Sequence, residues 1–242
     1  MSYQDFRPRS FQTLPLVIKN LLIINILMFA AKVVFRQSLG IEINPILGLD
    51  YITASDFKPY QLITYLFMHG DITHLFFNMF AVWMFGSVLE NVWGPKRFLI
   101  YYLITGLGAG LIQYIVFYFQ VQDVNEQISN LMQTPGFTAE DNISLIRQKS
   151  EFLNNLVVIG ASGSLFGLLL AFGMMFPNTM LYVYFLVPVK AKWFVIAYGV
   201  IELISGLRSN PMDNVAHFAH LGGMLFGFFV ILIWKKNRNF YS

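Results

Sequence analysis

The amino-acid sequence predicts an all-α, polytopic membrane protein in which six transmembrane helices form one bundle. Composition is the first reason, because 56% of the 242 residues are hydrophobic and 12% are charged, whereas soluble domains have roughly 25% charged residues. The mean hydropathy of +0.58 agrees with this. The other reason is the length of the apolar stretches. A membrane-crossing helix needs about 20 apolar residues, and stretches close to that length recur along the chain.

Six apolar segments are predicted to form these helices: residues 14–35, 75–89, 98–119, 156–176, 193–207 and 215–234. The second and fifth are short. We expect them either to extend into the apolar residues that precede them, 60–68 and 180–189, or to lie partly in the membrane interface. The first follows Arg7 and Arg9, as a secretory signal would, but it is longer than the apolar core of a signal peptide. It is therefore interpreted as a retained helix.

The basic residues predict the orientation of the bundle. Six crossings put both termini on one side, and the basic residues near the segment ends fall on that same side: Arg7, Arg9, Lys19, Lys96, Arg97, Lys190, Lys192, Lys235, Lys236 and Arg238. Loops that carry such residues stay in the cytoplasm. We expect an integral, multi-pass protein of a bacterial inner (plasma) membrane with both termini cytoplasmic. The net charge of +3 reflects this topology and indicates no nucleic-acid partner.

Residues 1–242 are expected to form a single membrane domain with one outer polar insertion, residues 121–155. Within the insertion, Thr138 and Asp141 flank a sequence of capping-box form, which predicts the start of a short helix. A solvated or interfacial helical hairpin is the favoured interpretation. The alternative is a lid, because the insertion leads directly into the fourth apolar segment.

Two glycine-flanked polar residues are the candidates for chemistry. Ser162 lies in the sequence GASG (160–163) and His220 in AHLGG (219–223), both inside apolar segments. A polar group in hydrocarbon is costly and suggests function, and a matched serine and histidine suggest the nucleophile and base of acyl transfer. The chain has no cysteine, which excludes a thiolate nucleophile and a metal site of the Cys/His kind. We expect no metal and no cofactor.

Depth in the membrane connects these residues. The second, fourth and sixth segments all run inward from the outer side, so His74, Ser162 and His220 are each expected about 5–12 Å below the outer boundary. His74 and Asn78 stand four residues apart and share a helix face, where both could donate hydrogen bonds to an oxyanion. Each residue alone has a structural explanation, and the joint occurrence at one depth favours catalysis.

Close packing of the fourth and sixth helices is predicted from small residues at four-residue spacing, Gly163, Gly167 and Ala171 on one helix and Gly223 and Gly227 on the other. Such packing would bring the Ser162 hydroxyl to the His220 ring.

The sequence GASGS departs from the G-x-S-x-G nucleophile elbow of hydrolases at its last position. No strand-turn-helix is predicted around it, so that elbow is rejected.

Other ionisable residues receive structural interpretations. No Asp or Glu stands where it is expected to orient the base, so a Ser/His dyad is predicted. Glu90 is expected to form salt bridges with the nearby Lys96 and Arg97. His69 and His217 are interpreted as structural residues near the outer ends of helices. The role of Glu202, which lies deeper, stays open.

These motifs together resemble the rhomboid family of intramembrane serine proteases over residues 69–227. The sequence HGDITHLFFN (69–78) is similar to the family's His and Asn motif, ENVWG (90–94) to its Glu-x-x-x-Gly turn, and the segments around Ser162 and His220 to its two catalytic motifs. The resemblance implies a rhomboid-like bundle with Ser162 as nucleophile, His220 as general base, and His74 and Asn78 as oxyanion side chains.

Two positions differ from the family pattern. Residues 37–60 contain no Trp-Arg pair of the kind often found in the first outer loop of relatives. Phe166 stands one turn after Ser162, where relatives often have tyrosine. A phenylalanine can still stack on the His220 ring, although it has no hydroxyl to donate.

The predicted function is intramembrane serine endopeptidase activity on single-pass transmembrane proteins near the outer face of the bilayer. The expected partners are these substrates and the lipid bilayer, with no nucleic acid. One alternative is a catalytically inactive rhomboid-like protein that binds membrane clients, although such relatives commonly lose the serine or the histidine. The other is a small transporter or channel lined by Ser162, Glu202 and His220, without the inverted repeats common in such folds.

Overall fold

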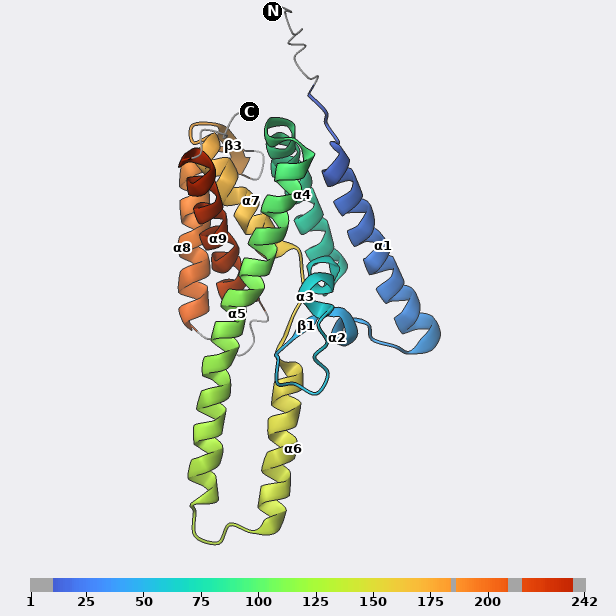
Figure 1. Ribbon diagram of the computed structural model, residues 1–242, viewed down its shortest axis with the longest axis vertical. Helices are drawn as coiled ribbons and strands as arrows, with labels where there is room; N and C mark the ends of the chain where they lie inside the picture. The colour runs from blue at the N-terminus through green and yellow to red at the C-terminus, as the bar shows by residue number, and fades with distance from the viewer. Residues whose placement is uncertain (1–10, 184–185, 209–214, 237–242) are drawn as a thin grey trace, which may run out of the picture.

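The described part of the protein is an α-helical bundle with two small β-ladders (Figure 1). The computed structural model describes residues 11–183, 186–208 and 215–236. The helices are α1 Leu16–Leu39, α2 Asn44–Leu47, α3 Gln61–Thr64, the 3₁₀ helix η1 Tyr65–Phe67, α4 Ile72–Trp93, α5 Pro95–Met132, α6 Ala139–Asn155, α7 Ser162–Met175, α8 Ala191–Arg208 and α9 His217–Lys236. The strands are β1 Leu49–Asp50, β2 Val157–Val158, β3 Met180–Val183 and β4 Val187–Lys190.

The predicted class, an all-α membrane bundle, is confirmed, and each of the six predicted segments overlaps one helix, α1, α4, α5, α7, α8 or α9. Among the described residues, α1, α4, α5 and α9 are long and apolar enough to cross a membrane, whereas α7 is a shorter apolar helix. Six membrane crossings therefore stay a prediction. Figure 1 shows that α1 begins and α9 ends at the same end of the bundle. Arg7, Arg9 and Arg238, used above for orientation, lie outside the described residues.

The fourth segment differs from its prediction, because residues 156–161 are not helical. Val158 pairs with Leu49 in an antiparallel ladder, and the Gly160 N–H donates to the Tyr65 carbonyl at 2.9 Å. Gly160 has φ +123°, a conformation that favours glycine. Branched residues before it favour extended backbone over helix. Ser162 is consequently the first residue of α7, and the expectation of no strand-turn-helix at this place was wrong.

Glycines set the spacing of the three central helices, α5, α7 and α9. A Cβ on Gly223 of α9 would lie 1.9 Å from the carbonyl oxygen of Gly163 on α7. The predicted close approach of these two helices therefore exists. Gly163 and Gly167 themselves face α5, where a Cβ would lie 2.3 Å from Ala109 Cβ and 2.6 Å from Thr105. The small residues of α7 thus serve its contact with α5.

Glu90 has a different role from the salt bridge that was expected. It is 3% exposed, and its two carboxylate oxygens accept hydrogen bonds from the N–H groups of Val17 and Ile18, each at 2.9 Å. The N-cap residue of α1 is Pro15, which provides no side-chain cap. A carboxylate compensates the unpaired N–H groups and the positive end of a helix dipole. Glu90 therefore caps α1 from α4.

The polar insertion forms a helical hairpin. Helix α5 has 38 residues, about 57 Å at 1.5 Å per residue, and its end lies beside α6, beyond the other long helices (Figure 1). The predicted capping box is confirmed: the Asp141 N–H donates to Thr138 Oγ1 at 3.2 Å, and the Thr138 N–H donates to the Asp141 carboxylate at 2.9 Å. Hydrogen bonds from Thr138 hold the pKa of Asp141 below its usual value. The helix that this capping box begins is α6, which ends at Asn155 and is longer than the short helix that was expected.

Candidate active site

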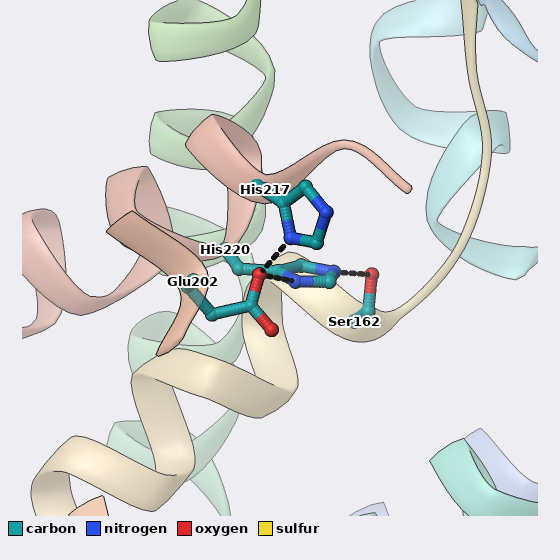
Figure 2. A network of polar contacts seen from close by, with 4 residues as sticks. All are labelled: Ser162, Glu202, His217 and His220. Atoms are coloured by element: carbon teal, nitrogen blue, oxygen red, sulfur yellow. Dashed lines mark hydrogen bonds and ion pairs between the residues drawn. The ribbon is translucent and has the colours of Figure 1, made fainter. Parts of the chain in front are cut away.

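Ser162 and His220 meet where α7 and α9 begin. Ser162 Oγ lies 2.8 Å from Nε2 of His220, and Figure 2 shows the ring directed at the hydroxyl. Phe166 stacks on the His220 ring with 4.2 Å between centroids and 7° between planes. The stacking expected of this phenylalanine is thus confirmed. The imidazole is held at one face by Phe166 and at one nitrogen by Ser162.

The structure also places a carboxylate beside the histidine. Oε2 of Glu202, on α8, lies 2.9 Å from His220 Nδ1 and 2.6 Å from His217 Nδ1 (Figure 2). Glu202 and His220 are each 8% exposed. The expectation that no Asp or Glu is placed to orient the base was therefore wrong. His217, interpreted as a structural residue, holds the same carboxylate oxygen.

A sequence signal for Glu202 existed but was incomplete. The buried residues of α8 are Ala191, Val195 and Glu202, which share one face of the helix at spacings of four and seven. An ionisable residue on the buried face of an apolar helix is a candidate functional group. The sequence could not predict which neighbour that face meets.

His74 and Asn78 line the same cavity as Ser162 and His220. Its volume is about 870 Å³. Asn78 is 6% exposed, and its Nδ2 is buried without a hydrogen-bond partner among the described residues. A buried amide donor is costly to leave unpaired. Asn78 therefore has a donor available at the wall of the cavity.

The position of His74 is maintained by the turn before α4. The Asp71 carboxylate accepts the His74 N–H at 2.8 Å as the N-cap, and this bond holds the pKa of Asp71 below its usual value. The Gly70 N–H donates to His74 Nδ1 at 3.4 Å, which leaves Nε2 as the donor nitrogen. The His69 ring packs edge-on against His74, and burial lowers the pKa of His69 to about 4. Lys32 Nζ donates to the carbonyls of His69 and Gly70.

One group of side chains has the composition of a metal site. Glu202, His217 and His220 each offer one ligand atom, and these atoms lie within 4.8 Å of one another. Ligands at about 2.0–2.1 Å from a tetrahedral zinc ion stand roughly 3.3 Å apart. The observed separations of 2.6 and 2.9 Å are those of hydrogen bonds, so a cation would have to move these side chains apart. That the protein uses no metal stays a prediction.

Comparison with known proteins identifies the class of this bundle. The Rhomboid domain matches residues 56–237, which include Ser162, Glu202 and His220. The chain belongs to the rhomboid family. It is 30% identical over 217 residues to RHOMBOID-like protein 6, mitochondrial, of Arabidopsis thaliana, covering 81% of this chain and 57% of the relative.

Two further relatives show the range of this rhomboid family. RHOMBOID-like protein 12, mitochondrial, of Arabidopsis thaliana is 26% identical over 215 residues, 86% of this chain and 55% of the relative. The putative rhomboid protease YdcA of Bacillus subtilis is 27% identical over 184 residues, 75% of this chain and 71% of the relative. The chain spans little more than half the length of the two plant relatives.

Family membership and the apolar helices make the chain an integral membrane protein of the rhomboid class, a class that includes intramembrane proteases and rhomboid-like proteins. The named relatives include mitochondrial proteins, so they do not support a bacterial inner membrane in particular.

Proposed function

We propose that this rhomboid is a serine-type endopeptidase that cleaves single-pass transmembrane proteins near the outer face of the bilayer. The observation that carries the proposal is the 2.8 Å separation between Ser162 Oγ and His220 Nε2 at the wall of a cavity. A hydroxyl needs such an adjacent base to become a nucleophile. Residues 1–242 act as one membrane domain, with residues 121–155 as its outer insertion.

In the first half of the reaction, Ser162 Oγ attacks the carbonyl carbon of the scissile peptide bond and gives its proton to His220 Nε2. A C–O bond forms, and the carbonyl oxygen becomes an oxyanion. The C–N bond then breaks, and the leaving amine takes the proton from His220. The products of this half are an acyl ester on Ser162 and a free amine.

In the second half, His220 removes a proton from water, and the resulting hydroxide attacks the ester carbon. The C–O bond to Ser162 breaks, the Ser162 oxygen recovers the proton from His220, and a carboxylic acid leaves. Both tetrahedral intermediates carry an oxyanion. His74 Nε2, Asn78 Nδ2 and the first-turn N–H groups of α7, which have no intrahelical partner, are the donors proposed to stabilise it.

Substrate and water reach the site at the end of the bundle where α4, α7 and α9 begin. These three helices run in the same direction (Figure 1). Water enters the cavity from the outer face. A substrate helix must unwind locally before it reacts, because a helical peptide bond is hydrogen-bonded and sterically shielded. The cavity of about 870 Å³ has room for a short unwound segment.

The orientation proposed is that both termini face the side on which basic residues gather, which is the cytoplasm for a bacterial inner membrane. Lys96, Arg97, Lys235 and Lys236 lie at that end of the helices. The choice of a bacterial inner membrane rests on this pattern alone. Reporter fusions at either terminus test the orientation, and a reporter exposed on the outer side would contradict it.

The experiment that tests the proposal is turnover of a fluorogenic transmembrane peptide by the purified full chain in detergent and in liposomes. We expect cleavage within or next to the membrane-spanning part of the peptide, with mass spectrometry locating the cut. Folded protein that binds the peptide and never cleaves it would contradict the proposal and favour a client-binding rhomboid-like protein.

Asn78→Ala tests the oxyanion donors. We expect kcat to fall about 10²- to 10³-fold, the usual effect of losing one such donor, with little change in KM. Asn25→Ala is a matched control, because Asn25 is a fully buried asparagine of α1 that donates to the Leu21 carbonyl. The control should lose stability and keep kcat. Equal kcat in the Asn78 variant and wild type would remove this side chain from the site.

A further inference from the structure

Two side chains, Glu202 and His217, extend the Ser162–His220 pair into a continuous hydrogen-bonded chain. Ser162 Oγ contacts His220 Nε2, His220 Nδ1 contacts Glu202 Oε2, and the same oxygen contacts His217 Nδ1 (Figure 2). We propose that Glu202 is a positioning residue that completes a Ser162–His220–Glu202 triad, and that His217 holds Glu202 in place. The inference rests on the proposed serine endopeptidase function.

The first step of the argument is the position of the protons. An ionised carboxylate only accepts hydrogen bonds, so both nitrogens that contact Glu202 Oε2 must carry hydrogen. His220 then has its proton on Nδ1 and a lone pair on Nε2, directed at the Ser162 hydroxyl. This is the tautomer that a general base requires. Without an acceptor at Nδ1, the ring could equally hold its proton on Nε2, where it could not receive the proton of Ser162.

The second step is the cost of burying the carboxylate. Glu202 is 8% exposed, and a buried charge is tolerated only when hydrogen bonds compensate it. The two N–H donors at 2.6 and 2.9 Å supply such bonds to one oxygen. His217 therefore compensates the charge of Glu202 and orients it through a second hydrogen bond to the same oxygen that contacts His220.

The third step concerns charge during the reaction. When His220 accepts the Ser162 proton, it becomes a cation between Glu202 at Nδ1 and the developing oxyanion. The carboxylate stabilises that cation, and Phe166 keeps the ring from turning away. A fixed anion in a site with little water stabilises a charge far better than one in bulk solvent. The carboxylate therefore lowers the barrier to proton transfer.

The test compares two buried glutamates in the full chain, once the wild type has been shown to cleave. In Glu202→Gln we expect kcat to fall by up to about 10⁴-fold, the loss seen when the acid of a serine-protease triad becomes an amide, with KM within about twofold of wild type. Glu90→Gln is the matched control, because Glu90 also accepts two N–H bonds at 2.9 Å but caps α1. The control should lower Tm and leave kcat unchanged.

The pH profile separates positioning from packing. Within the described part of the chain, the titratable groups that face His220 are Glu202 from α8, His217 from α9 and His74 from α4 across the cavity. Glu202 contacts the proposed base directly, whereas Glu90 contacts only the start of α1. The acidic limb of the pH–rate profile should therefore change its position in Glu202→Gln and stay in place in Glu90→Gln.

The outcomes are distinct. Wild-type kcat and an unmoved acidic limb in folded Glu202→Gln would overturn the triad and leave the proposed function standing, whereas an inactive wild type would overturn the function itself. If Glu202→Gln does not fold, the variant Glu202→Asp tests the carboxylate instead. Partial activity with the acidic limb at its wild-type position supports the carboxylate role. Full loss of activity in folded protein contradicts it. Wild-type activity that a chelator removes and added Zn²⁺ restores would also overturn the triad, in favour of a metal at these three side chains.

Discussion

Replacement of Ser162 by alanine is expected to eliminate cleavage of a transmembrane peptide while the bundle stays folded. The substitution removes the attacking oxygen, and loss of the nucleophile from a serine protease costs about 10⁴- to 10⁶-fold in kcat. Ser162 is only partly buried, and its hydroxyl contacts His220 at the cavity. The loss of one such hydrogen bond changes stability by about 1 kcal/mol. Turnover and thermal unfolding of the same preparation measure both effects.

Ser164→Ala is the matched control for this prediction. Ser164 stands two residues further along α7, is fully buried, and donates to the Tyr102 carbonyl at 2.8 Å. Its loss should lower stability by about 1 kcal/mol and leave kcat near the wild-type value. Residual cleavage in Ser162→Ala equal to that of Ser164→Ala would contradict the assignment of the nucleophile.

Gly223→Ala is expected to impair both stability and catalysis. The new Cβ would lie 1.9 Å from the carbonyl oxygen of Gly163, a backbone atom that no side-chain rotation can move. The backbones of α7 and α9 must separate, and overpacking of this kind costs about 1–3 kcal/mol. The shift also separates Ser162 from His220, and a displacement of about 1 Å can reduce activity about 10²-fold.

Gly199→Ala, on α8, is the control for added volume. Its Cβ would meet the flexible end of Met224 at 3.3 Å, which can move aside. Alanine is also about 1 kcal/mol better than glycine inside a helix, so this variant should keep its Tm and its turnover. A Gly223→Ala protein with wild-type Tm and kcat would show that the contact of α7 with α9 does not set the site.

The bundle and the pairing of Ser162 with His220 were predictable because both depend on local patterns. Apolar segments of membrane length predict helices, and three segments that run in the same direction bring residues of equal offset to one level. The capping box at Thr138 was predictable for the same reason, since it involves only neighbours in sequence. The stacking of Phe166 on His220 followed from their pairing once α7 and α9 were placed together.

The remaining features depend on tertiary contacts that no local pattern encodes. The capping of α1 by Glu90 joins residues more than 70 positions apart, and nothing near Glu90 in the sequence indicates it. The extended segment before Ser162 depends on its pairing with β1. Glu202 lay on a recognisable buried face of α8, but its contact with His220 required the packing of α8 against α9.

The most direct measurement of the central claim is the labelling of the full chain with a fluorophosphonate, which reacts with serines activated by a neighbouring base. We expect mass spectrometry to find the label on Ser162 in the wild type, and to find labelling at least about 10²-fold slower in His220→Ala, because the hydroxyl then lacks its base. Folded wild-type protein without label on Ser162, or labelling at an undiminished rate in His220→Ala, would contradict the activation of Ser162 by His220.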